Sequence, residues 1–397
     1  MLSVYEGFFS GGARIVHSDV VMGLQEGGRH RQQVLSLHAE VHREATRQRM
    51  EDDACYRALT AAGVPVTALG RSFGAGDPGH RLPFTGRELA GTARAMAGAD
   101  VVLSLKEQPL ALLNQRGLPR RPVIVCLHRS DPEHQGSALD DLRTAIADGT
   151  VVACVCCAES TREAYRAAGV PGDLLHVIPN GVDLLRFRPD AARRAALRDT
   201  LGIPHTAPVV VFAARYDGMK NVPLFLRAAR AWLAHEGEGH VLMCGAGMTA
   251  SNPGLLADIS AAFGADLSRL APRLHPLGVR RDMENLYAAS DVVALTSAWG
   301  EAAPLCLIEG MMCGAVPVAT DVGDTAAIVS GHGILTPPDP DSIALAWTGA
   351  LAGRADFGPA LLRSRERFSR TRMIAAYADL IDRVHAEATL PPLTEPL

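Results

Sequence analysis

The segment of residues 291–320, DVVALTSAWGEAAPLCLIEGMMCGAVPVAT, constrains the fold of this chain more than any other. It begins with a short apolar run typical of a β-strand, continues with helical spacing from Pro304 until Gly314, and ends in a second strand, VPVAT. This order predicts one βαβ unit, and ligands of open parallel sheets bind outside the carboxyl ends of the strands. Glu301 and Glu309, eight positions apart, would therefore face one ligand at that edge.

The start of the expected helix suits an anion. The backbone N–H groups of Leu305 and Cys306 lie in the first turn, where N–H donors have no partner within the helix, so they would point at a group such as a diphosphate. Glu309, one turn further in, would accept hydrogen bonds from a ribose. The alternative is a solvent-exposed helix face, because the chain carries 43 acidic residues and chance pairs must occur.

The bulk properties exclude several classes of protein. With 397 residues, 48% of them hydrophobic, the chain is long enough for two or three domains with their own cores. A net charge of −4 offers no general basic field for nucleic acid or anionic lipid. No apolar run approaches the roughly 20 residues of a membrane span, and the first residues lack a cationic signal region. We therefore expect a cytoplasmic protein, with peripheral membrane contact left open.

Three of the eight cysteines crowd into VVACVCCAES, as Cys154, Cys156 and Cys157. A metal site or a redox pair is one interpretation, but the spacing fits no zinc knuckle. Alternation within an apolar run favours a buried strand, where free cysteine acts as a small hydrophobic residue. We expect no metal site and no disulfide bonds.

Two sets of alternating strands and helices follow one another along the chain. The strand-like runs of the first set are MLSVYEGFF, QQVLSLH, VPVTALG, DVVLSLK, PVIVCLH and VVACVCC. Those of the second set are PVVVFAARYD, HVLMCGAG, RLHPLG, DVVALTS and VPVAT. The alternation predicts an α/β protein with two Rossmann-like, doubly wound parallel-sheet domains facing a cleft. We place the domains at residues 1–195 and 196–375, and a final helix with a tail at 376–397, packing back across the domains.

The stretch of residues 38–59, HAEVHREATRQRMEDDACYRAL, is dense in charges of both signs. We expect an ordinary solvent-exposed helix. The alternative is an element that faces the acceptor or a membrane at the mouth of the cleft, although a membrane helix would have a more uniformly basic polar face.

Cations and glycines suited to phosphate follow the first strand of each half. In AARYDGMKNVPLF, Arg215 offers a planar fork for phosphate oxygens and Lys220 a mobile point charge. In FFSGGARIVH, Gly11 and Gly12 permit close approach of an anion to the start of a helix, although the dinucleotide fingerprint is incomplete. The alternative for Arg215 and Lys220 is a pair of surface cations.

His128 ends the apolar strand PVIVCLH, where an imidazole would contact a sugar hydroxyl or carry a proton, or would simply cap the next loop. Asp131 and His134 are polar candidates nearby. Nothing in this stretch of the sequence resembles a Ser-His-Asp hydrolase.

Taken together, these motifs resemble the retaining glycosyltransferases of family 4, which have the GT-B fold. The resemblance covers nearly the whole chain and rests on the order and spacing of SGGA, the strand-end His128, NGVDLLRF at residues 180–187, R-x4-K, GAG at residues 245–247 and E-x7-E. It implies that a sugar moves from a nucleotide sugar to an acceptor with retained configuration and without a metal. Residues 1–195 would bind the acceptor and residues 196–375 the nucleotide sugar.

The resemblance also implies roles for single residues. The diphosphate would lie against Gly11 and Gly12 and the start of the helix, and the base against a loop of the second domain. Glu301 would bind hydroxyls of the donor sugar, Glu309 the ribose, and His128 the sugar near the reacting carbon. Catalytic roles fall to His128, Arg215, Lys220 and Glu301, and donor-binding roles to Gly11, Gly12, Val279, Arg280, Pro304, Leu305, Cys306 and Glu309. The leaving phosphate itself would take the acceptor proton, so no carboxylate nucleophile is required.

Two departures from the family pattern leave the donor open. Glu301, Ala302, Ala303 and Pro304 stand where E-G-F-G is usual, and Asp324 and Ala327 replace a glycine and an acid of VGG-x-x-E.

We expect a hexosyltransferase-type enzyme, a monomer or homodimer, that uses a UDP- or GDP-sugar as co-substrate, UDP being favoured, and no other cofactor. The favoured acceptor is a small polar molecule, such as an aminoglycoside-like compound in antibiotic biosynthesis. The alternatives are a lipid- or polysaccharide-directed glycosyltransferase of the cell envelope, and a catalytically silent nucleotide-sugar-binding protein.

Overall fold

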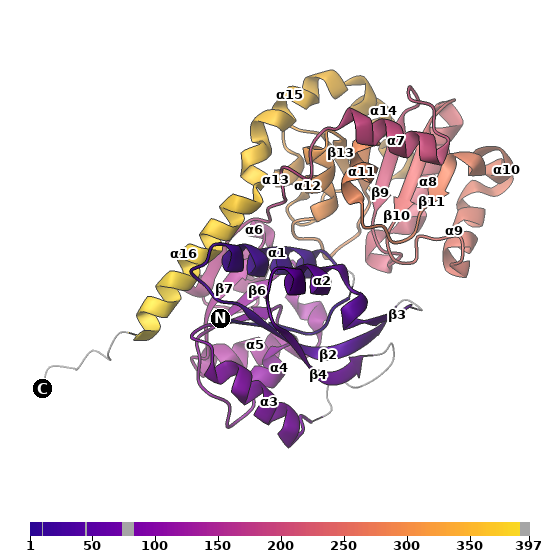
Figure 1. Cartoon of the computed structure of the whole chain (residues 1–397). Coiled ribbons are helices and arrows are strands. Elements are labelled where there is room, and N and C mark those ends of the chain that lie inside the picture. Colours follow the sequence, from indigo (N-terminus) through magenta and orange to yellow (C-terminus); the bar gives the residue numbers. More distant parts are fainter. Residues whose placement is uncertain (10, 44–45, 74–82, 390–397) are drawn as a thin grey trace, which may run out of the picture. The chain divides into compact units, whose positions relative to one another are not determined.

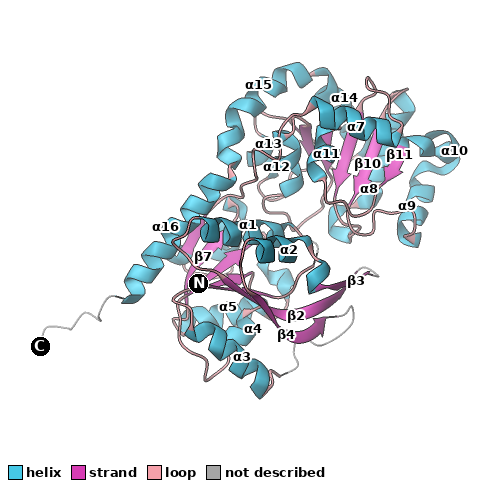
Figure 2. Ribbon diagram, in the orientation of Figure 1, coloured by secondary structure: helices cyan, strands magenta, loops and turns pink. Residues whose placement is uncertain are grey.

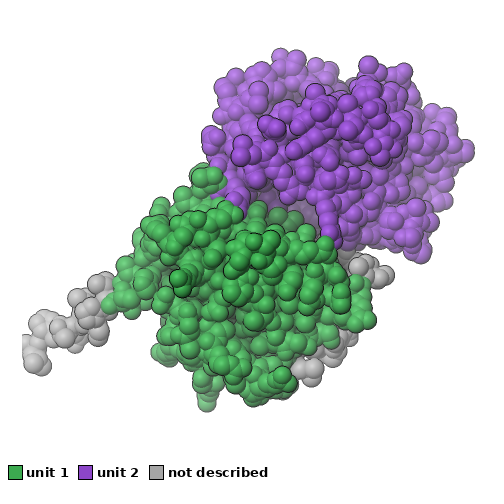
Figure 3. All heavy atoms as spheres, in the orientation of Figure 1, with its two compact units in different colours: residues 1–180, 371–397 green, residues 181–370 purple. Residues whose placement is uncertain are grey.

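The computed structural model describes residues 1–9, 11–43, 46–73 and 83–389. The chain divides into two compact units (Figure 3). Unit 1 comprises residues 1–180 and 371–397, and unit 2 comprises residues 181–370. The division lies earlier than the boundary at 195/196 placed from the sequence. The reason is that residues before position 195 already contact unit 2: Arg194 donates to the Asp291 carboxylate at 2.8 Å.

Unit 1 is built on an eight-stranded sheet with the order β3-β2-β1-β5-β6-β7-β8, in which β4 also pairs with β2. All its pairings are parallel except that of β2 with β3. The strands are β1 (Leu2–Tyr5), β2 (Gln33–Arg43), β3 (Thr46–Arg49), β4 (Val66–Phe73), β5 (Val102–Leu105), β6 (Val123–Leu127), β7 (Val151–Cys156) and β8 (Leu175–Val177). The strands predicted from the apolar runs are therefore confirmed, including the cysteine-rich one.

Helices cover both faces of this sheet (Figures 1 and 2). Residues of α1 and α2 share one apolar cluster with the sheet, and residues of α3, α4 and α5 share the other. The helices are α1 (Gly12–Glu26), α2 (Ala54–Ala61), α3 (Gly86–Ala97), α4 (Leu110–Leu113), α5 (Ala138–Ala147), α6 (Glu159–Ala167) and α16 (Arg370–Thr389). A Cβ atom on Gly23 of α1 would lie 2.1 Å from the Ile374 side chain of α16, so these two helices pack closely at this glycine.

The expectation of a solvent-exposed helix over residues 38–59 is wrong. β2 continues to Arg43 and forms an antiparallel pair with β3, and α2 is the only α-helix among the described residues of this stretch. The reason is burial in the sheet: His38 and Val41 are 5% and 2% exposed, and β4 pairs alongside. The density of charged residues had suggested exposure to solvent.

Unit 2 is built on a six-stranded parallel sheet with the order β11-β10-β9-β12-β13-β14. The strands are β9 (Val209–Ala213), β10 (His240–Cys244), β11 (Leu274–Pro276), β12 (Val292–Leu295), β13 (Val316–Ala319) and β14 (Ile334–Leu335). The α-helices are α7 (Ala191–Leu201), α8 (Val222–His235), α9 (Pro253–Phe263), α10 (Leu267–Leu270), α11 (Met283–Ala288), α12 (Leu305–Met312), α13 (Thr325–Val329), α14 (Pro340–Ala352) and α15 (Arg354–Ser364). The predicted βαβ unit is confirmed as β12, α12 and β13.

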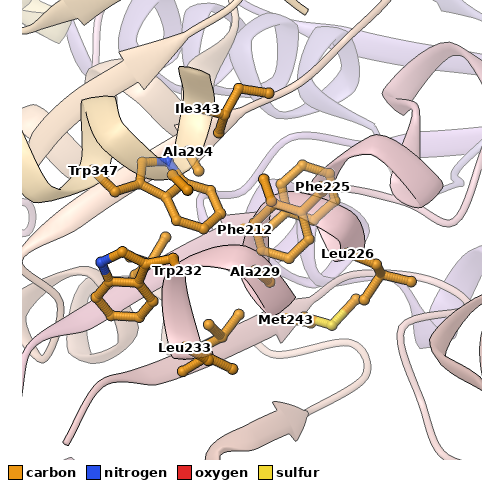
Figure 4. Close-up of a cluster of buried hydrophobic side chains, with 14 of the residues drawn as sticks. Phe212, Phe225, Leu226, Ala229, Trp232, Leu233, Met243, Ala294, Ile343 and Trp347 are labelled. Atoms are coloured by element: carbon orange, nitrogen blue, oxygen red, sulfur yellow. The ribbon is translucent and has the colours of Figure 1, made fainter. Parts of the chain in front are cut away.

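The core of unit 2 is rich in aromatic residues on one face of its sheet (Figure 4). Phe212 of β9 stacks on Phe225 of α8 with ring centroids 4.2 Å apart. Trp232 of α8 meets Trp347 of α14 edge to face at 5.9 Å. Each buried side chain of this size contributes roughly 1.5–3 kcal/mol of hydrophobic stabilisation. The sheet is thus a rigid support for the loops at its edges.

Within the described residues, no helix is long and apolar enough to cross a membrane.

Candidate functional site

The loops that carry most of the predicted site residues lie at the centre of the unit 2 sheet. The chain lays β9, β10 and β11 outward in one direction and then returns to place β12, β13 and β14 on the other side of β9. The direction of winding therefore reverses between β9 and β12. In sheets of this kind, ligands bind outside the carboxyl ends of the strands at this point. Arg215 and Lys220 follow β9, and Glu301 follows β12.

The turn after β9 holds Lys220 in a fixed position. A 3-10 turn spans Gly218–Lys220, and the Asp217 carboxylate accepts from the Met219 N–H at 2.9 Å. Asn221, the next residue, has a left-handed backbone with φ 49°. The Thr296 hydroxyl, at the end of β12, donates to the Lys220 carbonyl at 3.0 Å. The loops after the two central strands are thus joined directly.

Lys220, Glu301 and Ser297 form a polar cluster. The Lys220 ammonium is ion-paired with the Glu301 carboxylate, and the Ser297 hydroxyl donates to the same carboxylate at 2.6 Å. The Glu301 side chain is only 8% exposed and that of Lys220 15%. An ion pair shielded from water in this way holds both side chains in defined positions.

The loop that follows Glu301 is clamped by Gly323. Gly323 has φ 62°, and a Cβ atom there would lie 2.2 Å from the Glu301 carbonyl oxygen. The Asp324 N–H donates to the Ala302 carbonyl at 2.9 Å. Ala302 and Pro304 are buried, so this loop is packed against the following one. Gly323 was not among the residues selected from the sequence, although its place in VGD could have drawn attention to it.

Lys220, Glu301 and Glu309 gather around the start of α12. Burial raises the pKa of the Cys306 thiol to about 12, and the charges of all three groups act on it. No side chain caps α12, whose preceding residue is Pro304. Glu309 is 9% exposed and forms a hydrogen bond with the phenol of Tyr287. A carboxylate, an ammonium and the start of a helix therefore meet at one place.

Arg215 and the predicted base-binding residues lie at other points of the same edge. Arg215 is paired with Asp217 at 3.3 Å. Val279 is 66% exposed, and the Arg280 guanidinium donates to Asp282 at 2.9 Å, in the loop after the outer strand β11.

Close packing explains the two glycines of the GAG motif. A Cβ atom on Gly245 would lie 2.0 Å from the Ala214 carbonyl, and one on Gly247 would lie 2.7 Å from the Tyr216 side chain. Both glycines also have positive φ, at 139° and 77°. They let the loop after β10 pack directly on the loop after β9.

Gly11, the first of the two predicted glycines of unit 1, has no such packing reason. Gly11 precedes α1 with an extended backbone, and a Cβ atom there would meet nothing within 4 Å. Gly12, the first residue of α1, is exposed, and no side chain caps the helix. The predicted contact of Gly11 and Gly12 with an anion stays a prediction.

His128 follows β6 and belongs to a set of buried titratable groups. Its Nε2 atom and both ring nitrogens of His17 on α1 are buried without a hydrogen-bond partner in the described part of the chain. Burial lowers the pKa of each imidazole to about 3, and His17 contributes to the lowering at His128. Both rings are therefore neutral near pH 7. His17 was not selected from the sequence, where it looks like one polar residue in a helix.

Glu107 lies at the winding reversal of unit 1, between β1 and β5. It is 1% exposed, and burial raises the pKa of its carboxyl group to about 7. Lys106, which joins it to β5, has a left-handed backbone with φ 67°. Neither residue was selected from the sequence. A non-glycine residue in this conformation is strained by roughly 1–3 kcal/mol, and such strain is frequent at functional sites.

The other polar candidates near His128 form a local cluster. Arg129 donates to both carboxylate oxygens of Asp131 at 2.6 Å, and His134 lies 3.8 Å from the same carboxylate with 74% of its side chain exposed. Across the residues that the structure covers, no group of three or more His, Cys, Asp or Glu side chains is placed to hold a metal ion.

Two family models match the chain. One described as Glycosyltransferase Family 4 matches residues 11–186, and one described as Glycosyl transferases group 1 matches residues 207–352. Among curated relatives, a D-inositol 3-phosphate glycosyltransferase of Xylanimonas cellulosilytica is 30% identical over 272 residues, covering 65% of this chain and 61% of the relative. That of Saccharomonospora viridis is 33% identical over 224 residues, covering 52% and 50%. The chain thus spans less than two thirds of the length of these relatives.

Solved structures share the fold. Anabaena Alr3699/HepE in complex with UDP and glucose has a TM-score of 0.74 at 20% identity, covering 96% of this chain and 98% of that one. A sucrose-phosphate synthase from Thermosynechococcus elongatus has a TM-score of 0.68 at 18% identity, covering 97% and 99%. Together with the two parallel-sheet units and the matched models, these similarities show that the chain belongs to the group 1, family 4 glycosyltransferases and has the GT-B fold.

Proposed function

We propose that this protein is a retaining glycosyltransferase that moves a sugar from a UDP-sugar to a small polyhydroxylated acceptor. The observation that carries the proposal is the convergence of Lys220, Glu301 and Glu309 around the uncapped start of α12. Cations and backbone N–H groups suit a diphosphate, and carboxylates suit the hydroxyls of a ribose and a sugar.

The proposed roles in the donor site follow from this arrangement. Lys220 and the N–H groups of Leu305 and Cys306 would stabilise the charge that develops on the leaving diphosphate. Glu309, held by Tyr287, would accept from the ribose hydroxyls. Glu301, held by Ser297, would bind donor-sugar hydroxyls and keep the Lys220 ammonium beside the diphosphate.

UDP is the favoured nucleotide. Structures with the same fold include complexes of Anabaena Alr3699/HepE with UDP and with UDP-glucose. Val279 is exposed in the loop that would contact the base. An exposed apolar side chain in this loop suits contact with the face of a planar ring.

The proposed chemistry is substitution on the same face of the sugar, in which the leaving phosphate takes the acceptor proton. It requires preorganised positive charge more than a nucleophilic carboxylate, and the Glu301 carboxylate is already engaged by Lys220 and Ser297. We propose that no metal is needed, because Lys220, Arg215 and the helix start would supply the positive charge.

The acceptor is proposed to be a small polyol. The first relatives are named for D-inositol 3-phosphate, a cyclic polyol that carries a phosphate. In unit 1, the neutral imidazole of His128 can exchange hydrogen bonds with a hydroxyl without adding a charge.

The test is calorimetric titration of the purified protein with UDP, GDP and ADP and with their glucose conjugates, followed by a transfer assay with D-inositol 3-phosphate and other polyols. We expect saturable binding of UDP and of its conjugate, weakened in Arg215→Ala and Glu309→Ala. Arg269→Ala, which alters an exposed arginine on α10, is the matched control. Binding of no nucleotide by folded protein would refute the donor site. Donor binding without transfer or hydrolysis would favour the catalytically silent alternative.

A further inference from the structure

The three tryptophans of the chain divide sharply by exposure. Trp232 and Trp347 are 1% and 0% exposed and contact each other in the core of unit 2 (Figure 4). Trp299 is 50% exposed. A single exposed apolar residue is ordinary on a protein surface, so the exposure alone indicates nothing. The exposure of Trp299 becomes informative because this residue lies in the candidate site.

Trp299 lies between Ser297 and Glu301, which form the cluster with Lys220. The neighbouring Ala298 N–H donates to the Met219 carbonyl at 2.9 Å, which attaches this loop to the turn after β9. The Cη2 atom of the indole lies 4.0 Å from the position of a Cβ atom on Gly218, the first residue of that turn. The indole is therefore supported by the backbone that holds Lys220, and half of its surface is open.

A half-exposed indole in the loop that carries the Glu301 carboxylate is a suitable surface for carbohydrate. The face of an aromatic ring is electronegative, whereas the C–H groups on one face of a sugar ring are weakly electropositive and apolar. An indole loses little conformational entropy on binding, because it has only two side-chain torsions and here it is already supported by the Gly218 turn. The hydroxyl groups at the rim of such a ring need hydrogen-bond partners, and carboxylates are strong acceptors.

We propose that the indole of Trp299 is a stacking surface for the C–H face of a sugar ring whose hydroxyl groups are bound by Glu301. The inference rests on the proposed function and names a specificity-determining residue for it. The ring can belong to the sugar of the nucleotide donor or to the acceptor, and the two sources are separated by the choice of probe.

The first measurement is acrylamide quenching of tryptophan fluorescence in the full chain. Because Trp232 and Trp347 are buried, the quenchable fraction comes from Trp299. Four probes are compared: UDP, UDP-glucose, glucose with UDP, and D-inositol 3-phosphate with UDP. We expect UDP alone to leave quenching unchanged. Protection by UDP-glucose identifies the donor sugar as the stacked ring, and protection only in the mixtures identifies the acceptor.

The second measurement is the affinity of Trp299 variants for the same probes. We expect Trp299→Ala to weaken binding of the protecting probe by about 2- to 12-fold, the range for a lost aromatic stacking contact, and to leave UDP affinity unchanged. Trp299→Phe should recover part of the loss while abolishing the fluorescence change. Leu345→Ala, a change at a 73% exposed residue on α14, is the control for loss of exposed apolar surface.

Three outcomes would overturn the inference. Equal protection by UDP and by every sugar-bearing probe would show that the indole senses the nucleotide. Unchanged affinity of Trp299→Ala for all sugar-bearing probes would show that no sugar contacts the indole. Absence of UDP binding would refute the proposed donor site, and the stacking role with it, whereas the first two outcomes leave the donor site intact.

Discussion

The winding of both sheets reverses at the carboxyl edge, but the side chains at the two edges differ in charge. In unit 2, the edge at the winding reversal carries the ion pair of Lys220 and Glu301. In unit 1, the corresponding edge carries groups whose neutral forms are favoured by burial, namely the imidazoles of His17 and His128 and the carboxyl of Glu107. The difference shows that the same strand arrangement can place an ion pair at one edge and titratable groups whose neutral forms are favoured by burial at the other.

The two edges also share a backbone feature. Among the described residues, Lys106 and Asn221 are the non-glycine residues with positive φ. Lys106 follows β5 and Asn221 ends the turn after β9, so each lies in a loop beside a winding reversal. Strain of this kind persists only where the surrounding structure holds it in place. The backbone of both edges is therefore arranged for the positions of particular side chains, and the contrast in charge can be tested one residue at a time.

Loss of the cation in unit 2 should have the largest effect. Lys220→Ala is expected to lower kcat by on the order of 10²-fold or more, because preorganised charges that stabilise a leaving group contribute at this level. Steady-state transfer rates and thermal melting are measured together, with Arg269→Ala as the control. Near-normal turnover in folded Lys220→Ala would remove the electrostatic distinction between the two edges.

The second-largest effect is expected from replacement of Gly323, which packs against the loop after Glu301. In Gly323→Ala the added Cβ atom would meet the Glu301 carbonyl at 2.2 Å, and the residue would keep a left-handed backbone. We expect a loss of about 1–4 kcal/mol in stability or a shift of the loop with weaker UDP-sugar binding. Gly331→Ala is the matched control, since Gly331 has φ 72° but no atom within 4 Å of the added Cβ. Equal losses in both variants would leave only backbone strain as the cause.

Because the imidazoles of unit 1 are neutral when buried, the folding stability of the protein should fall as the pH is lowered below 6.5. Burial lowers the pKa of His17 from 6.5 to about 3, so the unfolded chain binds more protons between these values. Stability should therefore decrease by up to about 1.4 kcal/mol per pH unit below 6.5 for this group alone. His17→Phe should flatten the slope of unfolding free energy against pH, whereas His134→Ala, at an exposed position, should not. An unchanged slope in His17→Phe would mean that His17 is not neutral when folded.

Glu107 should make folding stability fall as pH rises, the reverse of the effect of His17, and over a narrower range of pH. Burial raises the pKa of its carboxyl group from 4.5 to about 7, so the folded protein binds more protons there and loses stability as pH rises through this range. Glu107→Gln should raise the melting temperature above about pH 7 and have a smaller effect near pH 5. Exposed Glu133→Gln is the control. A gain that is equal at both pH values would indicate a packing effect and not a titration.

Much of the fold could be predicted from local patterns. The β12–α12–β13 unit was predicted because strand and helix periods are properties of neighbouring residues, and Gly314 marks the end of the helix. The spacing of Glu301 and Glu309 likewise follows from one loop and one turn of helix. The stretch of residues 38–59 was misjudged because its charges suggested a solvent-exposed helix, whereas pairing with β3 and β4 places its first residues in the sheet.

Less of the site could be predicted, because its contacts join segments far apart in the chain. Gly323 is needed where it approaches the Glu301 carbonyl, a contact that no local pattern indicates. His17 is one polar residue on α1 until burial beside Tyr5, with ring centroids 5.1 Å apart, favours its neutral form.

The sequence by itself determined which segments become strands and helices, that they form two α/β units, and which cations and carboxylates follow strand ends. These are consequences of residue spacing and turn chemistry. Only the tertiary structure decided that Lys220 meets Glu301, that Arg215 meets Asp217, and that His17 and Glu107 are buried. The physical reason is that charge state and contact depend on desolvation and on neighbours, which the order of strands in each sheet brings together.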